Sequence, residues 1–289
     1  MLNYNCSNLV LKAINTFKNF KNKIEFFIVD NNSNESNKEV LKKYEEEKDD
    51  FVHIFYNEEN LGFAKGNNVA LKKIEEFIKC DNVFILNPDV YINEDIIEQI
   101  DDFIKNTNDC GAVSIEHKDG NGGFSQRQGW DLPDYRTELK TSFYFLRKKY
   151  YKKIPICYSE KINKVDVIDG CFYGINYDLF KSIGFLDENT FLYYEENILG
   201  YKIKNINRQN YILKSDNNPI HDHQNSSTVR VKFRRNWKYY NKSRKYYCKK
   251  YLKIGLFKRF ILNVCIFFSN IEAFIISLFK RWFFKWNNL

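Results

Sequence analysis

The sequence is poor in the residues that mark fibrous and disulfide-stabilised proteins. Only 4 Pro and 12 Gly occur among 289 residues, of which 44% are hydrophobic and 28% charged. This composition excludes collagen-like, low-complexity and wholly disordered chains. The 7 Cys are an odd number with no C-x-x-C pair, so we expect reduced thiols rather than a disulfide framework. The length suits one large α/β domain with an appendage, or two small domains.

Signals for secretion and for common phosphate-binding loops are also missing. Residues Met1 to Ser7 contain no basic stretch followed by an apolar one, so we expect the protein to stay in the cytoplasm. Neither a Walker loop nor a G-x-G-x-x-G sequence occurs. P-loop NTPases and ordinary Rossmann dehydrogenases are therefore disfavoured.

Charge is distributed unevenly along the chain. Residues 228–289 contain 16 Lys and Arg and a single acid, Glu272, which gives this segment +15 and leaves −7 for the rest of a chain whose total is +8. An acidic body with a basic, aromatic-rich tail fits an anionic membrane surface or nucleic acid. Nucleic acid is the weaker partner, because the body carries no supporting motif.

Short apolar runs alternate with amphipathic segments before residue 117. The pattern predicts an α/β fold with a largely parallel sheet covered by helices, and its ligands at the carboxyl ends of the strands. Residues 117–165 have no regular pattern and are expected to form loops. The expected strands cover 24–29, 51–56, 83–86 and 111–116, and the expected helices cover 9–20, 66–79, 94–106, 178–183 and 194–206.

Polar clusters follow the predicted strands in a definite order. They are Asp30-Asn31-Asn32-Ser33, Asn60 to Asn68, Asn87-Pro88-Asp89, Gly170-Cys171-Phe172, Gly184 to Glu188, Phe191 to Glu196, and His221-Asp222-His223. This series resembles family 2 glycosyltransferases of the GT-A fold, a Rossmann-like architecture, and particularly their rhamnosyltransferase-like branch, which builds bacterial surface polysaccharides. The resemblance covers residues 1–227. Each motif alone is weak, but their order and spacing together are specific.

The resemblance implies a nucleotide-sugar site at the first clusters. Asp30 ends a buried strand, where its carboxylate can accept hydrogen bonds from a base or ribose, although an Asx turn alone would explain it. Gly62 and Gly66 permit close approach of a ligand at a helix start. The expected nucleotide-binding residues are Tyr4, Asn5, Asp30, Asn32, Gly62, Phe63, Lys65, Gly66, Asn67, Asn87 and Asp89. Only Met1-Leu2-Asn3 precede Tyr4-Asn5, so we expect either a shortened first strand or a true start upstream of the given sequence.

A metal site is expected from the same resemblance. Asn87-Pro88-Asp89 occupies the place of the family's D-x-D motif, so Asp89 becomes the expected carboxylate ligand of Mg²⁺ or Mn²⁺. The family often adds a histidine near the end of the domain, and we favour His221, with His223 as the alternative. Taken alone, Asn87-Pro88-Asp89 is typical of a turn.

Glu196 is the expected catalytic base. Glu195-Glu196 stands where the family carries Glu-Asp, whose second residue deprotonates the acceptor hydroxyl. A position at a helix start favours the ionised carboxylate. Acidic pairs at helix starts also occur simply as partners of the helix dipole.

The tail is expected to form an amphipathic helix over residues 254–283. Its longest uninterrupted apolar run is Val264 to Phe268, and Asn263, Asn270 and Glu272 break the pattern, which favours a helix on the membrane surface over one that spans it. A helix packed on its own domain or on a second copy is the alternative. Trp282 and Trp286 beside Lys280, Arg281 and Lys285 suit the headgroup region.

These observations predict a glycosyltransferase domain over 1–227 and a membrane-surface or partner-binding tail over 228–289. By the family resemblance, the expected enzyme is an inverting hexosyl- or deoxyhexosyltransferase that uses a nucleoside diphosphate sugar, UDP- or dTDP-linked, and a lipid-linked or surface glycan acceptor. It would lie at the inner face of the cytoplasmic membrane, with a homo-oligomer as a further option. Two alternatives stay open: a catalytically decayed relative that binds glycan or membrane, and a nucleotidyltransferase that makes the donor.

Overall fold

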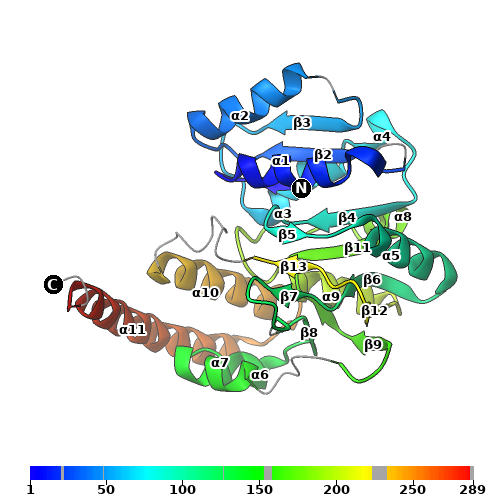
Figure 1. Cartoon of the computed structure of the whole chain (residues 1–289). Coiled ribbons are helices and arrows are strands. Elements are labelled where there is room, and N and C mark those ends of the chain that lie inside the picture. Colours follow the sequence, from blue (N-terminus) through cyan, green and yellow to red (C-terminus); the bar gives the residue numbers. More distant parts are fainter. Residues whose placement is uncertain (21–22, 48, 126, 153–157, 223–232, 287–289) are drawn as a thin grey trace.

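The computed structural model gives one α/β body with two long C-terminal helices (Figure 1). It describes residues 1–20, 23–47, 49–125, 127–152, 158–222 and 233–286, with side chains of the last helix described as far as Leu278. The sheets follow one another through the body, from β3 at one end to β9 at the other, and helices cover both faces (Figure 1).

The N-terminal sheet is parallel throughout. Its order is β1-β2-β3, formed by Leu2–Asn3, Phe26–Asp30 and Val52–Tyr56. β1 has two residues, and Leu2 pairs with Val29 of β2. All five residues of β2 are buried, which is typical of a central parallel strand. Helices α1 (Ser7–Thr16) and α2 (Glu35–Glu46) contact each other beside this sheet, and the short helix η1 (Lys18–Phe20) follows α1.

The second sheet is mixed, while the N-terminal sheet has the parallel arrangement expected from the sequence. Its order is β4-β11-β6-β12-β9, and only the β6–β12 pair is parallel. β11 runs antiparallel to both of its neighbours because it enters from the loops of the 117–170 region instead of from a crossover helix. The strands are Asn82–Leu86, Phe172–Asn176, Cys110–Ile115, Gln209–Leu213 and Ile162–Val165, in the same order.

Two smaller sheets extend the body near the ends of β4 and β6. β13 (Ile220–His221) lies between β5 (Val90–Tyr91) and β7 (Lys118–Asp119), and β8 (Gly129–Trp130) pairs with β10 (Val167–Ile168). The remaining helices of the body are α3 (Phe63–Leu71), α4 (Ile74–Phe77), α5 (Glu94–Asn106), α6 (Tyr135–Lys140), α7 (Tyr144–Tyr151), α8 (Tyr177–Ser182) and α9 (Glu195–Asn205).

Most elements expected from the apolar pattern are present within a few residues of their predicted bounds. The helix expected over 66–79 is divided into α3 and α4, and α3 begins three residues earlier at Phe63. The pattern did not reveal α2, since only Leu41 and Tyr44 of that helix are buried. It also did not reveal α6 and α7 in the irregular region, where α7 contains no buried residue.

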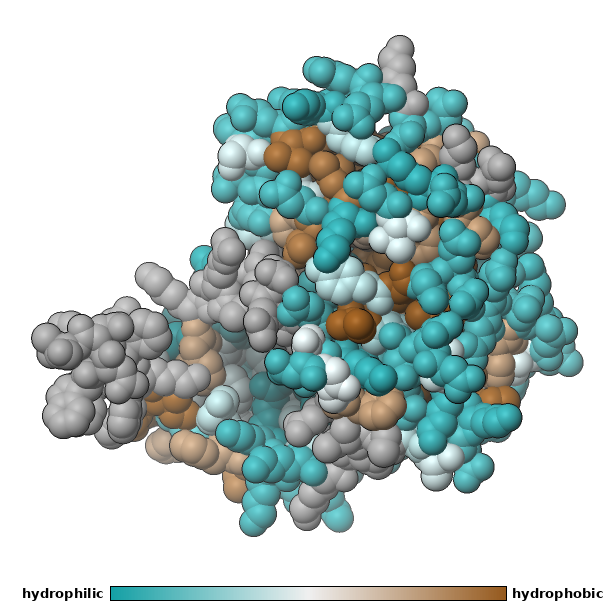
Figure 2. Space-filling view, in the orientation of Figure 1, coloured by the Kyte–Doolittle hydropathy of each residue, from teal (hydrophilic) through white to brown (hydrophobic). Residues whose placement is uncertain are grey.

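The tail consists of two helices, α10 (Phe233–Lys250) and α11 (Leu256–Trp286), which pack against each other. α10 belongs to the body, because Tyr240 and Tyr247 share a hydrophobic cluster with Tyr194 and Ile198. α11 contacts α7 and then extends away from the body (Figure 1). Apolar side chains gather along this arm (Figure 2), and those that are at least one-third exposed include Leu256, Phe257, Phe260, Val264, Phe267, Phe268, Ile271, Phe274, Ile275 and Leu278.

α11 is long and apolar enough to cross a membrane by length and composition, so the polar residues that favour a surface helix do not decide between the two positions. Leu256–Leu278 has a mean hydropathy of 1.9, and 22% of its most apolar stretch is buried in the protein. Two of the polar residues face the protein instead of the apolar side. Glu272 accepts hydrogen bonds from the backbone N–H groups of Tyr144 and Phe145, and Ser269 accepts one from the Trp237 indole.

Candidate active site

A cavity of about 340 Å³ opens at the carboxyl ends of β2 and β4. Asn31 follows β2 directly, and Asn87, Pro88 and Asp89 follow β4, as ligand sites of open α/β sheets require. The volume lies in the usual range for small-molecule sites. The residues that line it are Leu2, Tyr4, Cys6, Leu9, Asn31, Asn60, Gly62, Phe63, Asn87, Pro88, Asp89, Phe191, Leu192, Arg235, Asn236 and Tyr239.

A larger cavity of about 770 Å³ lies at the opposite ends of the same strands. It begins at Phe26 and Asn82, the first residues of β2 and β4, and extends along β4 as far as Leu86. Of the predicted site residues it contains only Asn67. The cavity at the carboxyl ends is therefore the candidate active site.

The loop after β2 is built by buried polar side chains. Asn31 accepts hydrogen bonds from the backbone N–H of Leu61 and the Asn57 amide, and donates to the carbonyl of Gly62. These bonds join the β2 loop to the loop before α3. Asn31 faces the cavity but was expected only as part of the cluster, not as a site residue.

Asp30 lies beneath this loop and does not line the cavity. Its side chain is fully buried, accepts a 2.7 Å hydrogen bond from the Asn3 amide and a 3.0 Å bond from the backbone N–H of Ser33. The Asx turn weighed from the sequence is thus present. In this geometry Asp30 fixes β1 to the β2 loop and has no face open to a base.

Gly62 is required by its backbone conformation and its neighbour. Its φ is +80°, and a Cβ there would lie 2.2 Å from the carbonyl oxygen of Phe191. The next residue, Phe63, donates its backbone N–H to that same oxygen at 2.9 Å. The loop before α3 is thereby fixed to the segment that leads into α9.

Asp89 and His221 meet although they are far apart in the sequence. β13 pairs with β5, with His221 opposite Val90, and the backbone N–H of Asp222 donates to the Asp89 carbonyl. His221 Nε2 lies 3.6 Å from Asp89 Oδ1, and both side chains are nearly buried. One carboxylate and one imidazole therefore face each other beside the cavity, which fits a divalent cation that accepts oxygen and nitrogen donors. The alternative ligand, His223, falls outside the described residues.

Glu196 lies in the first turn of α9, behind Phe63. Both side chains line a small cavity with Gly170 and Glu195, and Phe63 also lines the main one. Burial, with a contribution from Asp169, raises the pKa of Glu196 to about 7, so the helix start does not keep this carboxylate as acidic as expected. Burial also raises the pKa of Glu195 well above its ordinary value.

The turn that presents Glu196 is strained and is held by α10. Tyr193 and Tyr194 both have positive φ, 71° and 75°. The Tyr194 hydroxyl donates to Glu138, and the fully buried Arg244 of α10 contacts both groups, at 3.0 Å from Glu138 Oε2 and 3.1 Å from the Tyr194 oxygen. Non-glycine residues in this region of φ and ψ occur chiefly where surrounding structure enforces them.

Of the expected nucleotide-binding residues, Tyr4, Gly62, Phe63, Asn87 and Asp89 line the main cavity. The others lie behind or beside its wall, and none is among the lining residues. The side-chain oxygens of Asn5 and Asn32 accept hydrogen bonds, from the Asn34 backbone N–H and the Lys38 amine. In α3, the Asn67 amide donates to the Phe63 carbonyl, and a Cβ on Gly66 would lie 2.7 Å from Leu2. Lys65 is exposed.

The α10 side of the cavity was not foreseen. Arg235, Asn236 and Tyr239 line it together with Phe191 and Leu192. The sequence assigned these cations and aromatics to a membrane-facing tail, because no pattern linked them to a loop some 145 residues earlier. Among the lining residues that the structure describes, Arg235 is the one positively charged side chain.

Comparison with known proteins gives a consistent result. Residues 1–182, more than half of the chain, match the model of the family described as Glycosyl transferase family 2. The low-salt glycan biosynthesis hexosyltransferase Agl10 of Haloferax volcanii is 24% identical over 223 residues, covering 75% of this chain and 66% of that protein.

Three solved structures share the fold. GalNAc-T7 with UDP, GalNAc and Mn²⁺ aligns with a TM-score of 0.59 at 14% identity, over 89% of this chain and 48% of that one. The mannosyltransferase PcManGT of Pyrobaculum calidifontis with GDP-Man and Mn²⁺ gives 0.55 at 14%, over 96% and 71%. S. aureus TarS 1–349 with UDP gives 0.54 at 17%, over 90% and 68%.

The chain thus spans about two thirds of Agl10 and about half of GalNAc-T7. The GT-A fold expected from the motifs is confirmed by the mixed α/β architecture and by these neighbours. With a family model matched from the first strand through α8, and a cavity at the strand ends where the motifs converge, this chain belongs to glycosyl transferase family 2.

Proposed function

We propose that this protein is an inverting glycosyltransferase that moves a hexosyl or deoxyhexosyl group from a nucleoside diphosphate sugar to a hydroxyl of a lipid-linked or surface glycan. The observation that carries the proposal is the cavity at the carboxyl ends of β2 and β4, lined by Asp89 and Tyr4 and closed on one side by Arg235. The donor is UDP- or dTDP-linked in this proposal. Two of the three neighbours described above were solved with UDP and one with GDP-Man.

The nucleotide would occupy the main cavity. Tyr4 and Phe63 would offer aromatic faces to the base and ribose, with Gly62 in the wall between them, while Asn87 and Asp89 would lie at the diphosphate end. Asn5, Asp30, Asn32, Gly66 and Asn67 would support this wall from behind. Lys65 remains a predicted contact at the start of α3.

Arg235 is our candidate for a direct diphosphate contact from α10. A guanidinium matches phosphate oxygens with several fixed donors, and Arg235 is the one cation among the cavity residues within the described part of the chain. Binding of the donor would then depend on the tail as well as on residues 1–227.

The divalent cation, Mg²⁺ or Mn²⁺ in this proposal, would be held by Asp89 and His221. Their donor atoms are 3.6 Å apart next to the cavity, where the Asp89 carboxylate supplies the oxygen ligand that both Mg²⁺ and Mn²⁺ accept. When bound, such an ion neutralises negative charge on the leaving diphosphate.

Glu196 would act as the general base. Its carboxylate accepts the proton of the acceptor hydroxyl, the hydroxyl oxygen forms a bond to the anomeric carbon, and the bond from that carbon to the diphosphate breaks, which inverts the configuration. A pKa near 7 suits a base that must release its proton again at neutral pH. Phe63 separates Glu196 from the nucleotide side, so the acceptor would approach from the side of Gly170.

The lipid-linked acceptor and the cytoplasmic membrane surface are proposed from α11. Its exposed face is apolar while α10 is strongly basic, a combination that attracts anionic headgroups and buries apolar side chains at their boundary. A surface position suits α11 better than a span, since Leu262, Ile266 and Ala273 are buried against the body. A homo-oligomer through the same face is the competing occupant, and we propose no role for nucleic acid.

The test is transfer itself. Full-length protein is incubated with Mn²⁺, UDP- or dTDP-sugars and a polyprenyl-diphosphate glycan in vesicles, and the anomeric configuration of the product is read by NMR. We expect an inverted product from wild type and none from Glu196→Gln, while the surface control Glu98→Gln stays active.

A retained configuration, or full activity of Glu196→Gln, would contradict the mechanism. Nucleotide binding without transfer would favour the decayed, glycan- or membrane-binding alternative, and release of a nucleoside diphosphate sugar as product would favour a nucleotidyltransferase.

A further inference from the structure

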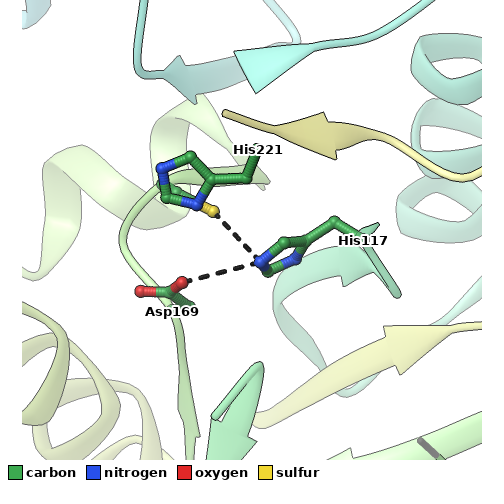
Figure 3. Close-up of side chains that lie close together, drawn as sticks. His117, Asp169 and His221 are labelled. Atoms are coloured by element: carbon green, nitrogen blue, oxygen red, sulfur yellow. Dashed lines mark hydrogen bonds and ion pairs between the residues drawn. The ribbon is translucent and has the colours of Figure 1, made fainter. Parts of the chain in front are cut away.

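Four side chains with metal-binding atoms converge beside the donor cavity. His117, Asp169, Cys171 and His221 each offer one atom, and these atoms lie within 4.8 Å of one another. His117 Nε2 is 3.8 Å from Cys171 Sγ and 3.8 Å from Asp169 Oδ2 (Figure 3). The nitrogen-to-oxygen distance is too long for a hydrogen bond but short enough for two ligands of one ion.

The backbone holds these four residues in place from separate elements. His117 follows β6 and donates its backbone N–H to Gln128 at 2.7 Å. Asp169 donates its backbone N–H to the carbonyl of the same Gln128, and Cys171 accepts at its carbonyl from Asn87. The backbone therefore brings the four ligand atoms within 4.8 Å of one another, so that small movements of the side chains would close them onto one ion.

The geometry does not fit a nucleophilic Cys–His–Asp arrangement. In such a relay the thiol and the carboxylate contact opposite nitrogens of the imidazole. Here Cys171 and Asp169 both approach Nε2 of His117. Cys171 is also only 3% exposed and lines none of the cavities described above, so no substrate can reach its sulfur.

We propose that His117, Asp169, Cys171 and His221 form a zinc site. Two imidazoles, one thiolate and one carboxylate make a four-donor set with the ligand types that Zn²⁺ takes in proteins. Mg²⁺ prefers oxygen ligands only, and the thiolate selects against it. With neutral imidazoles, the two anionic ligands balance the charge of Zn²⁺, so the buried site would be neutral once filled.

The site would have a positioning role for the proposed reaction. Gly170, between the ligands Asp169 and Cys171, hydrogen-bonds through its backbone to Glu196, and a Cβ on Gly170 would lie 2.9 Å from Glu196 Oε1. His221 is shared with the Asp89 pair, and its ring turns one nitrogen toward the cluster and the other away (Figure 3). A neutral His221 can bind zinc alone. With both ions bound, it would give up its ring N–H proton and bridge them as an imidazolate. Zinc would thus fix both the base and the donor-side histidine. This role depends on the proposed function, whereas zinc binding does not.

The experiment uses Co²⁺ as a spectroscopic substitute for Zn²⁺. Purified full-length protein is treated with a chelator, kept reduced and titrated with Co²⁺, and the thiolate-to-cobalt charge-transfer absorption is recorded. Zinc content before chelation is measured by elemental analysis. Cys171→Ser removes the proposed sulfur ligand, and Cys110→Ser, another buried cysteine outside the cluster, is the matched control. Thermal unfolding of each variant checks that it folds.

We expect one equivalent of Co²⁺ with a charge-transfer band that Zn²⁺ abolishes, complete loss of the band in Cys171→Ser and an unchanged band in Cys110→Ser. No band in the wild type, or the same band in Cys171→Ser, would overturn the proposal. Asp89→Asn separates the two proposals: it should keep the cobalt band and lose Mn²⁺-dependent UDP binding. UDP binding without a cobalt band would leave the glycosyltransferase standing and remove the zinc site, and a band without UDP binding would do the reverse.

Discussion

At the residue scale, the proposed transfer reaction depends on the carboxylate of Glu196, which is buried and yet must accept the proton of the acceptor hydroxyl. Glu196 is enclosed by α9, Gly170 and Phe63, and its surroundings raise its pKa to about 7. A base at this pKa is half protonated at neutral pH, so activity should depend strongly on pH.

The first prediction concerns this pH dependence. We expect kcat to rise tenfold per pH unit below about 7 and to level off above it, because only ionised Glu196 accepts the proton. The measurement is initial rate against pH at saturating donor and acceptor. A rate that falls as pH rises through 7 would contradict Glu196 as the base.

The same shift predicts a stability effect of opposite sign. The pKa of Glu196 is higher in the folded chain than its ordinary value of 4.5, so its contribution to stability is complete below that value and is lost as pH rises toward 7. Because glutamine does not ionise, Glu196→Gln removes the decrease in folding stability that ionisation of the buried carboxylate causes. At pH 8 we expect the variant to melt above the wild type while it lacks activity, and a lower melting temperature would show that Glu196 is not buried as an acid.

A third prediction uses the left-handed backbone at Gly62. Gly62→Ala places a Cβ at φ +80° and against the carbonyl of Phe191, at a cost of about 1–3 kcal/mol in the free energy of unfolding from backbone strain alone. Gly255→Ala is the matched control, since nothing lies within 4 Å of its Cβ position and its φ is not positive. Urea unfolding measures both variants. Equal stability of the two would contradict the described loop.

At the scale of elements, α10 connects the tail to the catalytic helix. Arg244 lies at its centre and donates to Glu138, Thr141 and Asn241. Glu138 also accepts a hydrogen bond from Tyr194, which is the N-cap residue of α9. The network therefore fixes the start of α9, and with it the position of Glu196 in the first turn.

We therefore predict a large effect for Arg244→Met. Removing one partner of a buried ion pair costs about 3–5 kcal/mol, which corresponds to a fall in melting temperature of roughly 10 °C for a chain of this size. Lys245→Met, on the exposed side of the same helix, should change the melting temperature little. Calorimetry of the two variants is the measurement, and similar melting temperatures would contradict the network.

The sequence predicted well those elements whose side chains are buried at regular intervals. β2 and α5 are examples: β2 is buried at every position, and α5 starts at Glu94 behind its cap Asn93, as periodicity and capping indicate. It failed where packing is sparse or distant. α7 buries no side chain, and the direction of β11 is set by pairing with β4 and β6, which no local pattern records.

The site shows the same division. Motifs after β1, β3 and β4 predicted Tyr4, Gly62, Phe63, Asn87 and Asp89, which line the cavity. Asp30 ends its strand in the expected place but turns its carboxylate to Asn3 and Ser33, which only the register of β1 on β2 decides. Arg235 and the His117 cluster were not found, because each depends on contacts between segments that lie far apart in the sequence.

At the scale of the whole molecule, the surfaces of the body and of the tail helices differ in charge and in hydropathy. The body is acidic in sum, whereas α10 is basic and α11 exposes a row of apolar side chains (Figure 2). Such a molecule should orient on an anionic membrane with α11 in the headgroup region and the cavity toward the cytoplasm.

The corresponding prediction is lipid-dependent sedimentation. Full-length protein should bind vesicles that contain anionic lipid more strongly than zwitterionic vesicles. High salt should weaken this binding, and complete release should also require removal of the exposed apolar side chains of α11. The triple variant Phe260→Ser, Phe267→Ser, Phe274→Ser should lose binding, while Ile162→Ser on β9 should not. Resistance of the wild type to alkaline carbonate extraction would instead favour α11 as a span, and unchanged binding of the triple variant would contradict the surface helix.

The central claim is that the cavity at the ends of β2 and β4 binds a nucleotide sugar together with a divalent cation. The most direct measurement is the melting temperature of the full chain with UDP-, dTDP-, GDP- and CMP-linked sugars, each with and without Mn²⁺. A ligand at a hundredfold excess over its dissociation constant adds about 2.7 kcal/mol, which raises the melting temperature by several degrees. The account predicts such a rise for a UDP- or dTDP-sugar, dependent on Mn²⁺ and absent in Asp89→Asn. No rise with any donor, or an equal rise in Asp89→Asn, would contradict it.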